Sequence, residues 1–206
     1  MFIYFLQGIT FGLAATATPG PFKAFLMTET AKNGWLRTLP TALVPIVTDG
    51  PIILLVMLVL TQTSTLFLTL LQVVGGGFIL YLAWGAWRTL TQPTPLQSGG
   101  QAAQRSFRNA VLMNFLNPNP YIFWSVIAGP ILLEGWRQSP GWGMIFILGI
   151  YGTFILGLAA FIIIFGMASR LGPKVSRGIS AVAFVMLLGF GLYQIWEGVQ
   201  QLIGGG

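Results

Sequence analysis

The 206-residue sequence contains no cysteine and no histidine. Without cysteine the chain has no disulfide framework, no thiol nucleophile and no thiolate metal ligand. Without histidine it also lacks Cys/His zinc sites, the Ser-His-Asp triad and imidazole proton relays. These absences exclude many enzyme classes, and we expect neither a metal site nor a cofactor.

Charged residues are also scarce, at 7% of the chain, whereas 55% of the residues are hydrophobic. An ordinary soluble domain has roughly 25% charged residues. Ten Lys and Arg with four Asp and Glu cannot cover a soluble protein of this size, so lipid must cover the rest. The net charge is +6, but the basic residues are scattered between apolar runs. They therefore indicate membrane topology rather than a nucleic-acid interface.

Six apolar runs are long enough to cross the hydrocarbon as helices, which takes about 20 residues. They lie near residues 2–30, 38–61, 66–88, 107–133, 142–168 and 178–203. Most basic residues flank the first, third and fifth connections, whereas the second connection has none. The positive-inside rule then places the odd-numbered connections in the cytoplasm and both termini outside.

A polar, low-complexity stretch divides the chain near its middle. It predicts a first three-helix unit at residues 1–88, a cytoplasmic linker at 89–106 and a second three-helix unit at 107–206. Proline motifs at 19–21 and 118–120 are each followed by an aromatic residue, a Gly-Trp pair and a further proline. An odd number of spans gives two similar halves opposite orientations. The fold predicted is an all-α integral membrane protein of six transmembrane helices in two inverted three-helix repeats.

The two proline motifs, Pro19-Gly20-Pro21 and Pro118-Asn119-Pro120, fall near the middle of the first and fourth spans. Proline inside a helix removes a backbone donor and clashes with the preceding turn, at roughly 3 kcal/mol or more. Such backbone is tolerated at membrane depth only where protein or a water-filled cavity satisfies it. Matching breaks in two halves indicate the solute site of a transporter, with packing kinks as the alternative.

Asp49 lies midway through the second span, where an ionised carboxylate costs roughly 2.5–3.5 kcal/mol to insert. It is a candidate for binding a proton or the solute. A purely structural role, pairing with a lysine or capping broken backbone, is the alternative. Lys23 follows the first break by one turn and either pairs with Asp49 or extends toward the cytoplasmic interface.

Three asparagines, Asn114, Asn117 and Asn119, precede or interrupt the second break. An amide side chain donates and accepts, so it suits an amino-acid head group and can equally cap a broken helix. We expect Asn117 and Asn119 to line the solute site, and the role of Asn114 stays open between the two.

Weaker signals surround these candidates. The hydroxyls of Thr18 and Thr48 are candidates to support the site, although threonine in a membrane helix usually bonds its own backbone. Trp124 lies deeper than the other tryptophans, where it can line a cavity. Gly8 and Gly12 form a Gly-x-x-x-Gly pair that predicts only a close helix contact.

These motifs, in this order, resemble those of the lysine exporter (LysE-type) family, which includes homoserine and threonine exporters. The resemblance covers essentially the whole chain and rests on residues 19–21, Asp49, the central linker and the run Asn114-Phe115-Leu116-Asn117-Pro118. It implies a secondary transporter that exports amino acids or related small solutes across the cytoplasmic (inner) membrane by alternating access, driven by protons. It also implies pairing as a homodimer.

The chain departs from the family pattern at two places. Many relatives have glycines before the acid of the second span, and Asn119-Pro120 replaces the usual continuation. The solute therefore cannot be carried over from the best-known members. Metal-ion efflux is one alternative, although a single central acid is a thin ligand set for a hard cation. A membrane enzyme or a non-transporting scaffold is the other.

Overall fold

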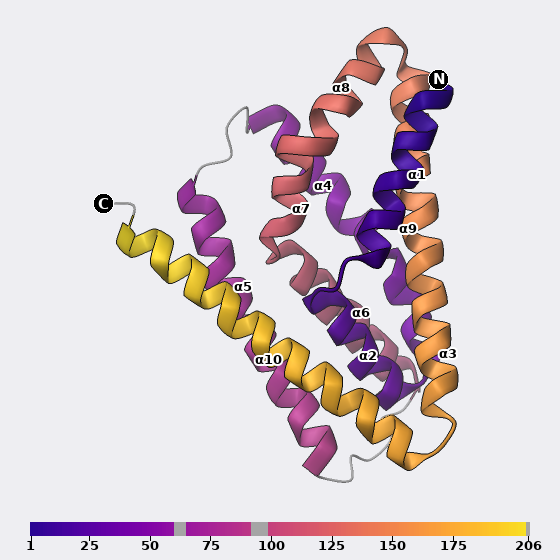
Figure 1. The fold of residues 1–206 in the computed structure, drawn as a ribbon, viewed down its shortest axis with the longest axis vertical. Coiled ribbons are helices and arrows are strands. Elements are labelled where there is room, and N and C mark those ends of the chain that lie inside the picture. Colours follow the sequence, from indigo (N-terminus) through magenta and orange to yellow (C-terminus); the bar gives the residue numbers. More distant parts are fainter. Residues whose placement is uncertain (60–64, 92–98, 205–206) are drawn as a thin grey trace.

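The computed structural model describes residues 1–59, 65–91 and 99–204, which form helices joined by short turns (Figure 1). In chain order the elements are α1 (Phe2–Ala17), α2 (Pro21–Asn33), α3 (Trp35–Thr38), a 3₁₀ turn η1 (Leu39–Leu43), α4 (Val44–Val59), α5 (Thr65–Thr91), α6 (Gly99–Phe115), α7 (Pro118–Ile122), a π-helical turn η2 (Phe123–Ala128), α8 (Gly129–Gln138), α9 (Pro140–Ser169) and α10 (Pro173–Gly204). The predicted all-helical class is confirmed for this part of the chain.

Within the described ranges, four helical stretches are long and apolar enough to cross a bilayer: Trp35–Val56, Leu66–Arg88, Pro140–Ser169 and Pro173–Ile203. The two other expected spans, 2–30 and 107–133, are each divided at their proline motif. α1 ends before the first motif and α6 before the second, and a new helix begins at Pro21 and at Pro118. The count of six spans in an inverted repeat therefore remains a prediction.

The second expected span begins with a tighter helix than predicted. The chain runs through α3 and the 3₁₀ turn η1 before it enters α4. Pro40 lies in the first turn of η1, where the proline ring is tolerated because the missing N–H has no helical partner.

The expected linker at 89–106 is mostly helical at its two ends. Residues 89–91 complete α5 and residues 99–106 form the first turns of α6, while 92–98 lie outside the described residues. Polar composition suggested a loop, but a polar helix is stable outside lipid when one face packs on the protein. Ser106 supplies such a contact, because its hydroxyl donates to the Glu29 carboxylate of α2.

Two long helix pairs frame the molecule. α1 lies against α9, and α5 lies against α10 along most of their length (Figure 1). Gly8 and Gly12 make the first contact close, since an added Cβ would collide with the backbone oxygens of Phe146 and Ile150. This is the helix contact that their spacing predicted.

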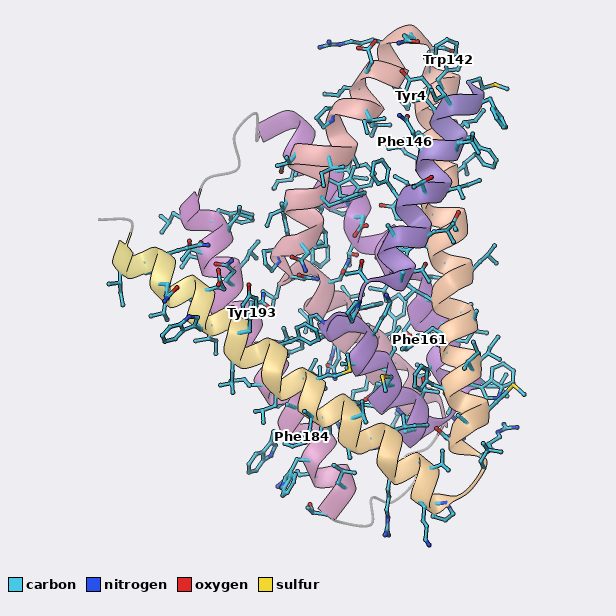
Figure 2. All side chains as sticks on the ribbon, viewed as in Figure 1. Tyr4, Trp142, Phe146, Phe161, Phe184 and Tyr193 are labelled. Atoms are coloured by element: carbon cyan, nitrogen blue, oxygen red, sulfur yellow. The ribbon has the colours of Figure 1, made fainter. Side chains whose placement is uncertain are left out.

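Aromatic side chains reinforce the contact between α1 and α9 near the N-terminus. The Tyr4 and Trp142 rings lie 5.8 Å apart between centroids, at the end of the molecule where α9 begins (Figure 2). Phe146 packs one turn farther along α9 and is fully buried. These contacts therefore hold the part of α1 that precedes the first break against α9.

The short helix α2 lies at the centre of the bundle, in contact with α10, α9 and α6. Its residues from Pro21 to Thr28 are all buried, including the charged Lys23. It ends at Gly34, whose φ of 81° is the left-handed conformation that favours glycine. After the first break, the chain therefore passes from the more exposed helix α1 into the interior of the bundle.

Candidate functional site

Both helix breaks open onto one cavity of about 630 Å³. Asp49 from α4 lines the same cavity, as do parts of α6 and α9. Of the residues predicted for the site, only Pro118 and Thr48 do not line it. Pro118 is buried, and the buried Thr48 hydroxyl donates to Asp49 Oδ1 at 3.3 Å. The predicted residues brought together are Thr18, Pro19, Gly20, Pro21, Lys23, Asp49, Asn114, Asn117, Asn119 and Pro120.

Asp49 is the point where three helices meet. Its Oδ1 accepts a hydrogen bond of 2.9 Å from Asn114 Nδ2, and its Oδ2 accepts one of 3.0 Å from the Tyr151 hydroxyl. Asn114 Nδ2 also reaches the Thr48 hydroxyl at 2.6 Å. Asp49 is 9% exposed, and the cost of its burial is offset by donors from α6 and α9.

Lys23 closes the first break. Its ammonium donates to the backbone oxygens of Ala15, at 2.9 Å, and of Thr16 and Thr18. The carbonyls of Ala15 and Thr16 belong to the last turn of α1 and that of Thr18 to its C-cap residue, where helix oxygens lack intrahelical partners and the helix dipole favours a cation.

Neither arrangement expected for Lys23 occurs. Its side chain is 7% exposed, so it does not extend to the interface, and the described residues contain no ion pair between it and Asp49. The physical reason is proximity. The carbonyls at the end of α1, which lack intrahelical partners, lie close to Lys23, and three of them accept all three hydrogens of its ammonium group.

The second break is closed by neutral groups. The Tyr121 hydroxyl donates to the Phe115 backbone oxygen at 2.9 Å, and the Asn117 side chain accepts from the Asn119 backbone N–H at 3.1 Å. Asn117 is thereby the N-cap of α7. The Asn114 side chain lines the cavity and donates to Thr48 and Asp49, so it does not cap the broken helix, and its contact with the solute stays a prediction.

Sequence reasoning missed the aromatic wall of the cavity, apart from Trp124. Phe123 and Trp124 come from the π-helical turn η2, and Tyr151 and Phe154 come from α9. Trp124 is 1% exposed, and its ring stacks on Tyr151 with centroids 6.4 Å apart. One signal was present: Tyr151 is the only tyrosine in the 140–169 run and lies near its middle.

The cavity contains two opposite charges that do not form an ion pair with each other. Among the described residues that line it, Asp49 is the one acid and Lys23 the one base, and each is held by other partners. The remaining wall is largely aromatic and aliphatic. Such a cavity can hold a small solute that carries an ammonium and a carboxylate on an apolar body.

Comparison with known proteins identifies the fold family. The sequence model of the LysE type translocators matches residues 13–198, which includes both breaks and Asp49. The chain belongs to the LysE type translocator family. This translocator is 28% identical over 209 residues to "Putative amino acid efflux protein YcgF" of Bacillus subtilis (strain 168), across 97% of this chain and 99% of the relative. No solved structure matches the translocator.

The family assignment confirms the resemblance found in the motifs. Together with the long apolar helices, it makes this translocator a multi-pass membrane protein that acts in transport rather than as an enzyme.

Proposed function

We propose that this translocator exports amino acids or related small solutes across the cytoplasmic membrane. The observation that carries the proposal is the single cavity lined by both helix breaks, Asp49 and Lys23. The name of the Bacillus subtilis relative refers to amino acid efflux, which supports amino acids as the solute class and export as the direction of transport.

In this proposal the solute's ammonium group binds Asp49, and its carboxylate lies near Lys23 and the amides of the second break. Asp49 and Asn114 face the cavity together. The aromatic wall from α9 and η2 then accommodates the side chain of the solute. Burial of both charges would be offset by these contacts rather than by water.

We further propose that Asp49 couples transport to protons. An ionised carboxylate only accepts hydrogen bonds, and here it accepts from both Asn114 and Tyr151. A proton on either oxygen would remove the negative charge that strengthens both hydrogen bonds, and would thereby weaken them. Protonation would thus loosen α4 from α6 or from α9, which is the kind of packing change that alternating access needs.

The proposed topology is six spans in two inverted repeats, with both termini outside and a homodimer as the assembly. The six-span repeat is supported by the four long apolar helical stretches and by the two expected spans that are broken at matching proline motifs. The end of α5, the start of α6 and the α9–α10 turn also share the lower end of Figure 1. These segments carry most of the basic residues, as a cytoplasmic face should.

The test is counterflow of radiolabelled amino acids in proteoliposomes, with and without an imposed pH gradient. We expect a gradient to stimulate flux in the wild-type protein. Asp49→Asn keeps the size of the side chain but cannot ionise, so it should lose that stimulation. Glu134→Gln is the matched control, because Glu134 is exposed on α8 and does not line the cavity.

Two outcomes would contradict the proposal in different ways. Gradient-stimulated flux that survives Asp49→Asn would remove Asp49 from the coupling but leave amino-acid transport standing. Absence of flux for every amino acid in the wild type would reject amino acids as the solute and move metal-ion efflux or a scaffold role ahead.

A further inference from the structure

A second cavity, of about 300 Å³, lies between α2, α5 and α6. It shares no lining residue with the cavity that contains Asp49. The polar and charged side chains that line it are Thr28, Glu29, Lys32, Asn33, Arg88, Arg105 and Asn109. Unlike the first cavity, it is therefore rich in charged groups.

Positive charge prevails in this second cavity. Lys32, Arg88 and Arg105 line it together with a single acid, Glu29. Glu29 Oε2 accepts from neutral partners, namely Asn33 Nδ2 at 2.9 Å and the Ser106 hydroxyl. In the part of the chain that the structure describes, none of the three cations forms an ion pair with it. The lining of this cavity therefore carries a net positive charge.

The place of the cavity in the fold narrows the class of anion. Tyr81, Trp84 and Arg88 are spaced three and four residues apart, so they share one face of α5. Tyr81 is 56% exposed and Trp84 61% exposed, although both line the cavity. Exposed aromatic residues near a helix end are typical of the boundary between lipid and water.

The arginine at this boundary is already oriented by the aromatic face. The Arg88 guanidinium carbon lies 5.8 Å from the centroid of the Trp84 ring, a distance at which cation and ring attract. An opening flanked by lipid-facing aromatic rings admits a ligand sideways from the bilayer. Among the described residues that line the cavity around Asp49, Lys23 is the one base.

We propose that the second cavity binds the phosphate headgroup of an anionic phospholipid from the surrounding bilayer. Lys32, Arg88 and Arg105 supply the positive charge, and the Asn109 amide is a further donor on the same wall. Basic pockets between membrane helices on the cytoplasmic side are suited to such headgroups. A lipid bound here would join α2, which continues into the solute cavity, to α5 and α6.

The experiment is a lipid titration of the full-length protein in detergent, with the unfolding temperature as readout. Phosphatidylglycerol and phosphatidylcholine of the same acyl chains are compared at fixed ionic strength. We expect phosphatidylglycerol to raise the unfolding temperature at lower concentration than phosphatidylcholine. Removal of each basic side chain should raise the half-saturating phosphatidylglycerol concentration about fivefold. Each Lys or Arg near an anionic lipid surface contributes about 1 kcal/mol of attraction, which corresponds to that factor in affinity.

The variants separate a built site from general charge attraction. Arg88→Gln with Arg105→Gln removes two lining cations. Arg170→Gln with Lys174→Gln removes two exposed basic residues beside the α9–α10 turn, neither of which lines the cavity. Equal weakening in both double variants would overturn the proposal. If the first double variant does not fold, Lys32→Gln alone is compared with Lys174→Gln by the same criterion.

A third arm distinguishes the source of the phosphate. Glycerophosphoglycerol, the deacylated headgroup of phosphatidylglycerol, carries the same phosphodiester without acyl chains. If it stabilises the protein at the same concentration as phosphatidylglycerol, the ligand is a soluble anion and the lipid assignment fails. A preference for phosphatidylglycerol that only the lining variants remove would establish the site.

Discussion

At the first break, three backbone carbonyls at the end of α1 accept from the Lys23 ammonium, whereas at the second break one carbonyl, that of Phe115, accepts from the neutral Tyr121 hydroxyl. The breaks also differ in form. Thr18 and Gly20 are both extended at the first break, while Asn117 alone, also extended, caps the second helix. Similar proline motifs are thus accommodated in different ways.

The difference concerns what can displace each cap. A charged ammonium on a flexible four-carbon stem holds the first break. In the proposed binding mode the solute's carboxylate lies near Lys23, so it would compete with the α1 carbonyls for the same ammonium donors. The tyrosine ring that closes the second break is stiffer and buried. We expect the first break to move during transport and the second to stay closed.

The largest effect is expected at Lys23. Lys23→Met keeps the length of the apolar stem but leaves three carbonyls of α1 without their donor. Because these part-buried carbonyls would lose hydrogen bonds to a charged donor, we expect the free energy of unfolding to fall by roughly 3 kcal/mol. Unfolding in mixed detergent micelles, followed by circular dichroism, measures this change.

Lys174→Met controls for the loss of a positive charge as such, because Lys174 is exposed on α10. Lys23→Arg restores donors on a longer, planar group and should recover part of the lost stability. A Lys23→Met protein as stable as the wild type would show that water or lipid satisfies the α1 carbonyls, and the contrast between the breaks would disappear.

A smaller effect is expected at the second break. Tyr121→Phe removes one neutral hydrogen bond and keeps the ring, which packs against Phe67 with centroids 5.3 Å apart. We expect a loss of about 1 kcal/mol in the same unfolding assay. A loss as large as that of Lys23→Met would mean that the two caps are equivalent in strength, whatever their charge.

The fold was predictable where local chemistry decides it. Proline breaks a helix through its own ring, so the breaks at 19–21 and 118–120 follow from the sequence. The apolar runs beyond residue 140 likewise gave the long helices α9 and α10 to within a few residues. The helical start of α6 was missed, because its support comes from Glu29, far away in the chain.

Most of the polar residues that line the cavity around Asp49 could be predicted from the sequence, but their hydrogen-bond partners could not. The cost of a charge at membrane depth pointed to Asp49, and the breaks pointed to their own neighbours. The partner Tyr151 is on α9, and no local pattern places it beside Asp49. The role of Lys23 depends on the path of the chain through residues 18–20, which folds the helix back within reach of α1.

The smallest effect separates capping from solute contact at the second break. Asn117→Ala removes the N-cap of α7 and should lower the free energy of unfolding by about 1 kcal/mol. Asn119 contributes its backbone N–H to that cap, while its exposed side chain lines the cavity, so Asn119→Ala should change stability by less than about 0.5 kcal/mol. The KM of each variant for the transported solute, measured by counterflow, then completes the comparison. If Asn117 only caps, Asn119→Ala raises KM more than Asn117→Ala does, and the reverse order would make Asn117 the residue that touches the solute.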